Sequence, residues 1–307
     1  MLLDYMKGHM GGNTIALLLG DQVPGGREIP VAQRILSASY LACHEAGLLY
    51  HPREGGHLKV RIVEPGSSDY LIACGGLTQV LGKALVETSL GRHFGIETRE
   101  PLTQVLLETD AGPLKLNIQV EEGRASQVVS DLTLYGEACY RDGVYPLNLQ
   151  GVEVMRVGYF MVVAGEALAQ RYPGRDFAAL DAGARKVLVS LQEEFLAETG
   201  PASLGCALYD WNPCRGGDIR AVFPHNIREG WIEPACGTGT VAIGIALTEW
   251  GTLPQDGRVA LETGGEEDLG GPDRTLLDLK YEGGRLTEAF FSHSLIQLTS
   301  VGQVMVD

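Results

Sequence analysis

The sequence predicts an α+β protein built from two similar halves, and a repeat carries that prediction. Two segments align without a gap, A73-C-G-G-L-T-Q-V-L-G-K-A-L85 and A235-C-G-T-G-T-V-A-I-G-I-A-L247. They share an alanine, cysteine, glycine, threonine, second glycine, second alanine and leucine. Copies this far apart are not a short-period solenoid and indicate one duplicated domain per half.

Strand-like apolar runs surround each copy of the repeat, as an α+β unit requires. In the first half they are 15–19, 58–63, 70–73, 105–108 and 114–120, and in the second half 159–163, 206–209, 219–223, 259–263, 275–281 and 296–299. Residues 121–124 are typical of a hairpin turn, and the chain is expected to cross between halves near 135–142.

One longer amphipathic helix is also expected in each half. The first has Val31, Ile35, Ala38 and Ala42 on one face, between Pro30 and Gly47, and would contain Cys43. The second has an apolar face that stops at Gly200-Pro201 and is formed by Phe177, Leu180, Ala184, Leu188, Leu191 and Phe195.

Length, composition and charge limit the possible classes of function. A chain of 307 residues with 45% apolar content favours a globular protein of two domains. Acidic residues outnumber basic ones 39 to 24, and Lys and Arg form no stripe. We therefore expect neither a nucleic-acid nor a membrane partner.

The N-terminus and the cysteines predict a cytoplasmic protein with reduced thiols. Asp4 interrupts the apolar core that a signal peptide would need, and no apolar run is long enough to span a membrane. The six cysteines are irregularly spaced, unlike the framework of a small secreted domain.

The repeat has a pattern that suits acid–base chemistry. In each copy a strand ends at Ala-Cys, and the glycine that follows begins a helix with small residues along one face. A cysteine at a helix N-terminus has its thiolate stabilised by the dipole, so we expect a pKa lowered toward neutrality. The N–H groups of 75–76 and 237–239 (Gly75, Gly76, Gly237, Thr238 and Gly239) would bind an anion.

These features together predict a cofactor-independent amino-acid racemase. The two helix ends would hold the substrate carboxylate and stabilise the charge that develops when the α-proton leaves. One of Cys74 and Cys236 would remove that proton, and the other would protonate the opposite face. A single cysteine beside a glycine is more often a small buried apolar residue, but two symmetric copies favour function.

At these residues the chain resembles the superfamily of proline racemases, hydroxyproline epimerases and diaminopimelate epimerases. A-C-G-T-G-T, at 235–240, is similar to their second cysteine motif. At the first, C74-G-G-L stands where the family usually has C-G-N-G or C-G-H-G. K7-G-H-M-G-G-N13 resembles the substrate loop of diaminopimelate epimerases, and its H9-M-G-G12 portion that of proline racemases.

The resemblance extends along most of the chain. Residues 106–117 and 122–129 are similar to paired strands of proline racemases, and 298–306 to the last strand of diaminopimelate epimerases. It implies two pseudo-symmetric lobes, each a curved sheet or barrel wrapped around a central helix, with the active site in the cleft. The lobes would be 1–135, joined by a returning strand 294–307, and 136–293. It also implies no cofactor, no pyridoxal phosphate, no metal and a possible homodimer.

Further side chains are candidates for substrate binding. The family brings the loop of His9 and Asn13 to the substrate, although both residue types are also common in ordinary turns. Arg228 lies eight residues before Cys236, where diaminopimelate epimerases have a substrate arginine, but Ile227 replaces their glutamate. The C-x7-C spacing of Cys206 and Cys214, near His225, is not that of a structural zinc site.

Several functions stay open at this point. The substrate is an amino, imino or diamino acid, with proline-like and diaminopimelate-like compounds both possible. A dehydratase of a hydroxylated imino acid is an alternative, although related lyases typically retain one cysteine. Double-bond isomerases of the same fold rank below it. A non-catalytic amino-acid-binding protein would use the helix ends as a carboxylate trap.

Overall fold

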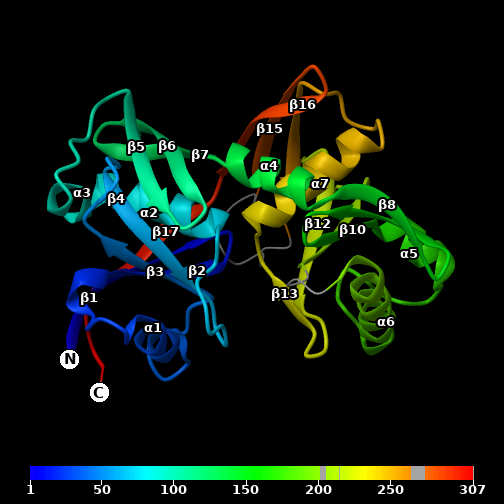
Figure 1. The fold of residues 1–307 in the computed structure, drawn as a ribbon, viewed down its shortest axis with the longest axis horizontal. Helices are drawn as coiled ribbons and strands as arrows, with labels where there is room; N and C mark the ends of the chain where they lie inside the picture. Colours follow the sequence, from blue (N-terminus) through cyan, green and yellow to red (C-terminus); the bar gives the residue numbers. More distant parts are fainter. Residues whose placement is uncertain (201–204, 214, 264–273, 307) are drawn as a thin grey trace. The chain divides into compact units, whose positions relative to one another are not determined.

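The computed structural model describes residues 1–200, 205–213, 215–263 and 274–306 and confirms the α+β class (Figure 1). The chain divides into two compact units. The first comprises Met1–Leu134 with Phe290–Asp307, and the second comprises Tyr135–Ala289. No helix in the described residues is long and apolar enough to cross a lipid bilayer.

The first unit is a sheet whose strands follow the order β17–β1–β2–β3–β4–β5–β6–β7. Neighbours are antiparallel except β2/β3 and β4/β5, which are parallel. The strands are β1 (Leu2–Met10), β2 (Asn13–Leu19), β3 (Glu45–Tyr50), β4 (Leu58–Val63), β5 (Leu102–Thr109), β6 (Gly112–Glu121), β7 (Arg124–Asp131) and β17 (Ile296–Met305). The helices are η1 (Gly20–Gln22), α1 (Glu28–Leu36), α2 (Gly75–Glu87) and α3 (Leu90–His93).

Helix α2 is the centre of the first unit's core (Figure 1). Its Leu77, Val80 and Leu81 are fully buried in a cluster with side chains from the surrounding strands. Gly82 is needed for this packing, since a Cβ there would lie 2.6 Å from the side chain of Val128 on β7. The small-residue face predicted from the repeat therefore lets a strand approach the helix closely.

The second unit has the strand order β8–β9–β10–β11–β12–β14–β15, and its helix α7 occupies the place of α2. The strands are β8 (Val144–Leu149), β9 (Val152–Val157), β10 (Phe160–Ala164), β11 (Gly205–Asp210), β12 (Ile219–Asn226), β13 (Trp231–Glu233), β14 (Gly257–Glu262) and β15 (Arg274–Glu282). Strand β16 (Arg285–His293) begins in the second unit and ends in the first. The helices are α4 (Thr133–Asp142), α5 (Gly165–Arg171), α6 (Ala182–Thr199) and α7 (Gly237–Glu249).

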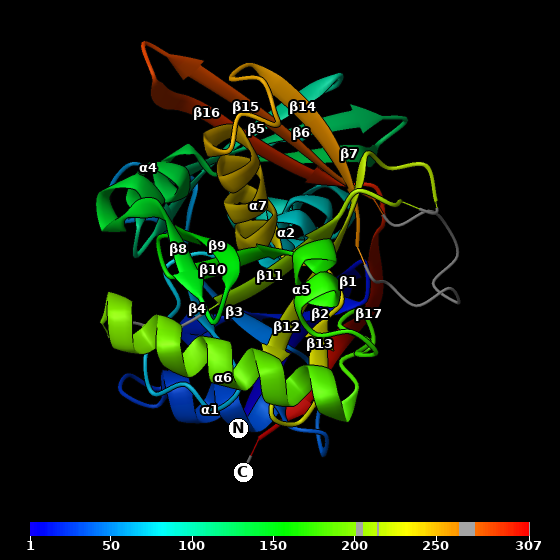
Figure 2. The same cartoon turned by 90° about the vertical axis from the view of Figure 1, so that its right-hand side faces the viewer.

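The two units repeat one succession of strand pairings. From β8 to β15 the pairs are antiparallel, antiparallel, parallel, antiparallel, parallel and antiparallel, as they are from β17 to β6. Figure 2 shows α6 on the opposite side of strands β8–β12 from α7. Gly244 of α7 again allows close approach, because its Cβ would lie 2.3 Å from Leu277.

A buried glutamate holds an equivalent loop in each unit. The carboxylate of Glu108, on β5, accepts the backbone N–H groups of Arg53, Glu54 and Gly56 at 2.8, 2.6 and 2.9 Å. Glu262, on β14, accepts those of Arg215 and Gly217. The duplication thus extends beyond the motif that revealed it.

Some sequence predictions need correction. The first amphipathic helix ends at Leu36 rather than near Gly47, and Cys43 lies after it, because the chain turns at Ser37 and enters β3 at Glu45. Residues 70–73 form only one isolated bridge, between Ile62 and Leu71. The second helix begins at Ala182, where Asp181 provides its N-cap, so Phe177 and Leu180 precede it.

Candidate active site

Cys74 is the N-cap of α2. Its backbone is extended, with φ −148° and ψ 113°, and its thiol accepts the N–H of Leu77 at 3.2 Å. The side chain is 8% exposed. A residue in the β region before the first helical turn suits this capping bond, and the two glycines that follow add no side chains beside the sulfur.

Cys236 has the same role at α7 in the second unit. Its φ is −129° and ψ 116°, and its thiol accepts the N–H of Gly239 at 3.3 Å. The Thr238 hydroxyl lies 3.4 Å from the sulfur. The predicted cysteine at the helix start is therefore confirmed in both copies, although no strand ends at Cys74 and β13 ends at Glu233, before Cys236.

The residues after each cysteine present backbone donors. Gly75 and Gly76 begin α2, Gly237 and Thr238 begin α7, and all four are buried. The first N–H groups of a helix have no acceptor within the helix, so they are available to an anion. Gly239 stands in the second unit where the first unit has Leu77. A Cβ at Gly239 would lie 2.7 Å from the ring of Phe223, so a side chain does not fit at this position.

The pKa of Cys236 corrects the expectation of an acidic thiol. Burial raises this pKa well above its ordinary value, and the negative charge of Glu233 raises it further. The bonds from Thr238 and from the N–H of Gly239 act in the opposite direction but do not offset burial. The Cys236 thiol therefore holds its proton in the unliganded protein.

A polar group of buried side chains surrounds Cys74. Asn13 is 1% exposed, and its side chain lies 3.2 Å from Nδ1 of His44. Glu45, at the start of β3, hydrogen-bonds to both Cys74 and Asn13, and burial raises the pKa of this glutamate to about 7. The structure thus brings Asn13 close to Cys74, which the loop resemblance had suggested only indirectly.

Space beside Gly76 also belongs to this group. A Cβ added at Gly76 would lie 3.5 Å from the Asn13 amide and 3.6 Å from Ile15 and Met10. These are ordinary contact distances. The absence of a side chain at 76, where the resembled family usually has one, is therefore not imposed by crowding.

His9 has a structural role in this fold. Its ring accepts the N–H of Gly12 at 3.3 Å and lies 3.3 Å from Gln297 on β17. These contacts fix the β1–β2 turn that presents Asn13.

Arg228 lies at the surface and forms an ion pair there. Its side chain is 72% exposed and pairs at 2.9 Å with Glu193 of α6. The carboxylate on that helix draws the guanidinium to the surface, so a substrate-binding role is not supported by its position.

The other thiols lie within cores. Cys206 is 2% exposed in the apolar cluster beneath α6, and burial raises its pKa to about 12, whereas Cys214 lies outside the described residues. Within the described part of the chain, no cluster of three or more metal-binding side chains is found.

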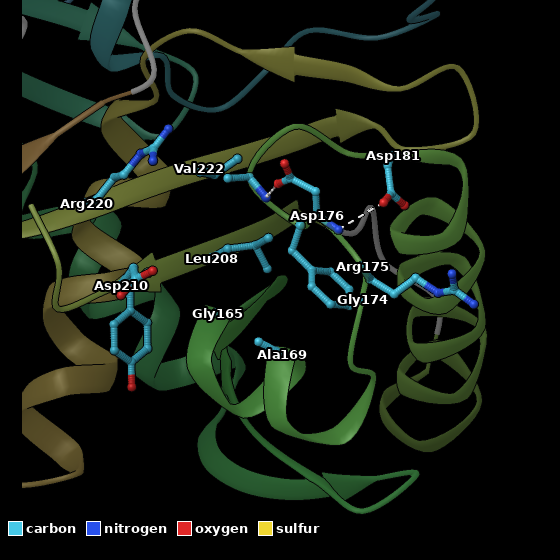
Figure 3. Close-up of a pocket in the computed structure, with 13 residues that line it drawn as sticks. Gly165, Ala169, Gly174, Arg175, Asp176, Asp181, Leu208, Asp210, Arg220 and Val222 are labelled. Carbon is cyan, nitrogen blue, oxygen red and sulfur yellow. Dashed lines mark hydrogen bonds between the residues drawn. The ribbon is translucent and has the colours of Figure 1, made fainter. Parts of the chain in front are cut away.

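A separate hollow of about 460 Å³ opens in the second unit, lined by α5, the 174–181 loop, β11 and β12 (Figure 3). Its Leu208 and Val222 belong to the cluster that α6 covers. The next residue, Phe223, faces Gly239 of α7 instead. Because side chains alternate along a strand, this hollow lies on the opposite face of β12 from Cys236.

Sequence reasoning missed Glu45, Glu233 and Tyr159. Tyr159 hydrogen-bonds to Thr238, and burial raises the pKa of its hydroxyl, which stays protonated beside Cys236. A charged or aromatic residue at a strand end is common, and no motif marks these three in the sequence. Only the folded chain reveals that they surround the cysteines.

Comparison with known proteins relates this architecture to solved structures. No protein-family model and no curated protein matches the chain. A hydroxyproline epimerase from Agrobacterium vitis, with bound trans-4-hydroxy-L-proline, has TM-score 0.67 and 16% identity over 99% of this chain and 91% of its own. A probable proline racemase from Agrobacterium radiobacter K84 has TM-score 0.70 and 15% identity over 99% and 93%.

The chain has the fold that these proteins share. A methylitaconate-delta-isomerase also has it, with TM-score 0.61 and 14% identity over 99% of this chain and 95% of its own. So does a phenazine biosynthesis protein of the PhzF family from Bacillus anthracis, with TM-score 0.62 and 12% identity over 100% and 99%. The resemblance inferred from the cysteine motifs is confirmed at the level of fold.

Proposed function

We propose that this protein is an isomerase that inverts the α-carbon of an amino or imino acid without a cofactor, using Cys74 and Cys236 as acid and base. The observation that carries the proposal is their equivalence: each thiol caps a central helix and accepts one backbone N–H from the first turn. A hydroxyproline epimerase and a probable proline racemase with this fold support the reaction class.

The proposed lobes are pseudo-symmetric and consist of 1–135 with 294–307 and of 136–293, and each provides one of the two cysteines. The substrate carboxylate binds to N–H groups of Gly75, Gly76, Gly237 and Thr238. There it delocalises the charge that forms when the Cα–H bond breaks. These backbone N–H groups need not move to stabilise the charge, because the buried helices already hold them in place.

In the proposed proton transfer, the two thiols act in opposite states. Cys74 as thiolate takes the α-proton, and the electron pair of the Cα–H bond moves toward the carboxylate. The Cys236 thiol delivers its proton to the opposite face and becomes the thiolate. Its raised pKa, a result of burial, suits the donor role in this direction. The reverse reaction exchanges the two roles.

We favour an imino acid such as proline or hydroxyproline as the substrate, and diaminopimelate-like compounds are the second choice. Asn13, buried beside Cys74, would contact the substrate. Arg228 is left out of this account because it pairs with Glu193 at the surface.

Solvent exchange tests the proposal. The reduced protein is incubated in D2O with proline, hydroxyprolines, diaminopimelate and other amino acids, and loss of the α-proton is followed by NMR. Exchange with accumulation of the opposite configuration is expected for one compound. Loss of water from a hydroxyproline would indicate the lyase instead. Tight binding without exchange, unaffected by Cys74→Ser, would indicate an amino-acid-binding protein.

A further inference from the structure

Glu45 is a buried carboxyl group in direct contact with Cys74. It begins β3, pairs in register with Ile15 of β2, and hydrogen-bonds to the Cys74 thiol and the Asn13 side chain. Its Oε2 atom is buried and has no hydrogen-bond partner among the described residues. An ionised carboxylate in such a place is unfavourable unless its charge is used or compensated.

Within the described part of the chain, no basic side chain is among the groups that act on the pKa of Glu45. Lys7, on β1, donates to the carbonyl of Leu41 at 2.6 Å, and its charge acts on Cys43. Burial raises the pKa of Cys43 to about 11, so this thiol is neutral. Glu64, after β4, adds negative charge that opposes ionisation of Glu45. His44 completes the polar surroundings through its contact with Asn13.

We propose that Glu45 is a positioning residue that accepts a hydrogen bond from the Cys74 thiol and takes its proton when Cys74 acts as the base. The inference rests on the proposed function and adds to it the origin of the base. The S–H bond breaks, the proton passes to the Glu45 carboxylate, and the pair keeps one negative charge, now on sulfur. The neutral carboxyl group then donates a hydrogen bond to the thiolate.

The second unit brings its glutamate to the cysteine from a different strand. The first residue of β11 is Gly205, which pairs with Phe160 as Glu45 pairs with Ile15, and a Cβ there would lie 2.5 Å from the Phe160 ring. Cys236 instead has the Thr238 hydroxyl and Glu233, at the end of β13, beside it, and the charge of Glu233 raises the pKa of its thiol. The duplicated fold therefore places a glutamate beside each thiol from a different strand.

The rate of cysteine alkylation, measured in the absence of substrate, tests the proposed Glu45–Cys74 pair. The Cys236→Ala protein is treated with iodoacetamide between pH 5 and 10, and modification of the Cys74 peptide is timed by mass spectrometry, because only the thiolate reacts. Two coupled groups titrate in two steps, so we expect a plateau between a lower and an alkaline step. Adding Glu45→Gln should remove the lower step and slow alkylation at pH 7 about tenfold.

Glu64→Gln is the matched control, since it removes a nearby carboxyl group that does not contact Cys74, and it should keep both steps. An equal or faster rate at pH 7 in Glu45→Gln, or an unchanged two-step profile, would overturn the proposal. If Glu45→Gln fails to fold by circular dichroism, Glu45→Asp replaces it and should keep two steps, since it retains an ionisable group. A single alkaline step in folded Glu45→Asp would count against proton transfer.

Activity provides the second readout. With Cys236 restored, Glu45→Gln should lower kcat about tenfold at pH 7, change KM by less than about twofold, and move the acidic limb of kcat at least one unit to alkaline pH. A purely structural glutamate would leave that limb in place. If no substrate is turned over by the unmodified protein, the proposed function fails while the alkylation profile still decides the role of Glu45.

Discussion

Cys74 and Cys236 occupy the same point of two equivalent helices. Each caps a helix of 13 residues and accepts the N–H of the third residue after it, at 3.2 Å for Cys74 and 3.3 Å for Cys236. Their surroundings differ, because Cys74 has Glu45 beside it and Cys236 has Thr238 and Glu233. The first relationship predicts a shared role, and the second predicts that the two thiols differ in reactivity.

Removing either thiol should abolish inversion. We expect Cys74→Ala and Cys236→Ala each to lower kcat by about 10²- to 10⁴-fold, the usual contribution of a positioned acid or base. The measurement is the rate of change in optical rotation on the substrate identified by exchange. Cys206→Ala, in the core beneath α6, is the control and should change kcat by less than about twofold. Retained turnover in either active-site variant would identify a different base.

The raised pKa of Cys236 predicts slow alkylation near neutral pH. In the Cys74→Ala protein, iodoacetamide should modify Cys236 appreciably only in the alkaline range, because burial disfavours its thiolate. Glu233→Gln removes a negative charge that raises this pKa, so alkylation at pH 8 should become faster. The exposed Glu229→Gln should have no effect. A slower reaction in Glu233→Gln would contradict this electrostatic interpretation.

Gly239 and Gly76 should respond differently to an added methyl group. In Gly239→Ala the new Cβ would meet the Phe223 ring at 2.7 Å and Cys236 Sγ at 3.3 Å, so we expect a loss of about 1–3 kcal/mol in unfolding free energy and a lower kcat. Gly76→Ala has ordinary contacts and should keep its stability. Urea denaturation compares the two, and equal losses would show that the site rearranges.

Glu108 predicts a pH-dependent contribution to stability. Three backbone N–H groups lower the pKa of this carboxyl group, the bond from Arg53 most of all. Its contribution is therefore present above the ordinary glutamate pKa and is lost as the pH falls through the lowered value. Glu108→Gln should reduce the urea midpoint at pH 7 but not under strongly acidic conditions. The exposed Glu121→Gln is the control, and a pH-independent difference would contradict the linkage.

The repeat made much of the fold predictable. The ends of β4 and the helix starts at Gly75 and Gly237 follow from periodicity and from the small residues after each cysteine. The first amphipathic helix was predicted too long because an apolar period continues past Leu36, where a turn begins. Local patterns do not reveal such a turn when later apolar residues belong to a strand.

The site was less predictable than the fold. The cysteines and Asn13 carry sequence signals, but Glu45 gains its role from a parallel pairing that brings β3 beside β2. The thiol pKa of Cys236 was predicted in the wrong direction because the helix dipole was considered without burial, and burial has the larger effect here. Arg228 was predicted from its spacing, which cannot reveal the competing carboxylate on α6.

The most direct test of the two-thiol mechanism is the position of deuterium at early times of inversion in D2O. The substrate identified by exchange is converted at low extent, and the Cα deuterium content of each enantiomer is measured separately by mass spectrometry after chiral separation. Two opposed thiols predict a product that carries solvent deuterium and a remaining substrate that keeps its proton. Deuterium in the remaining substrate, or substrate protons returned to the product, would show that a single base serves both faces and would contradict the account.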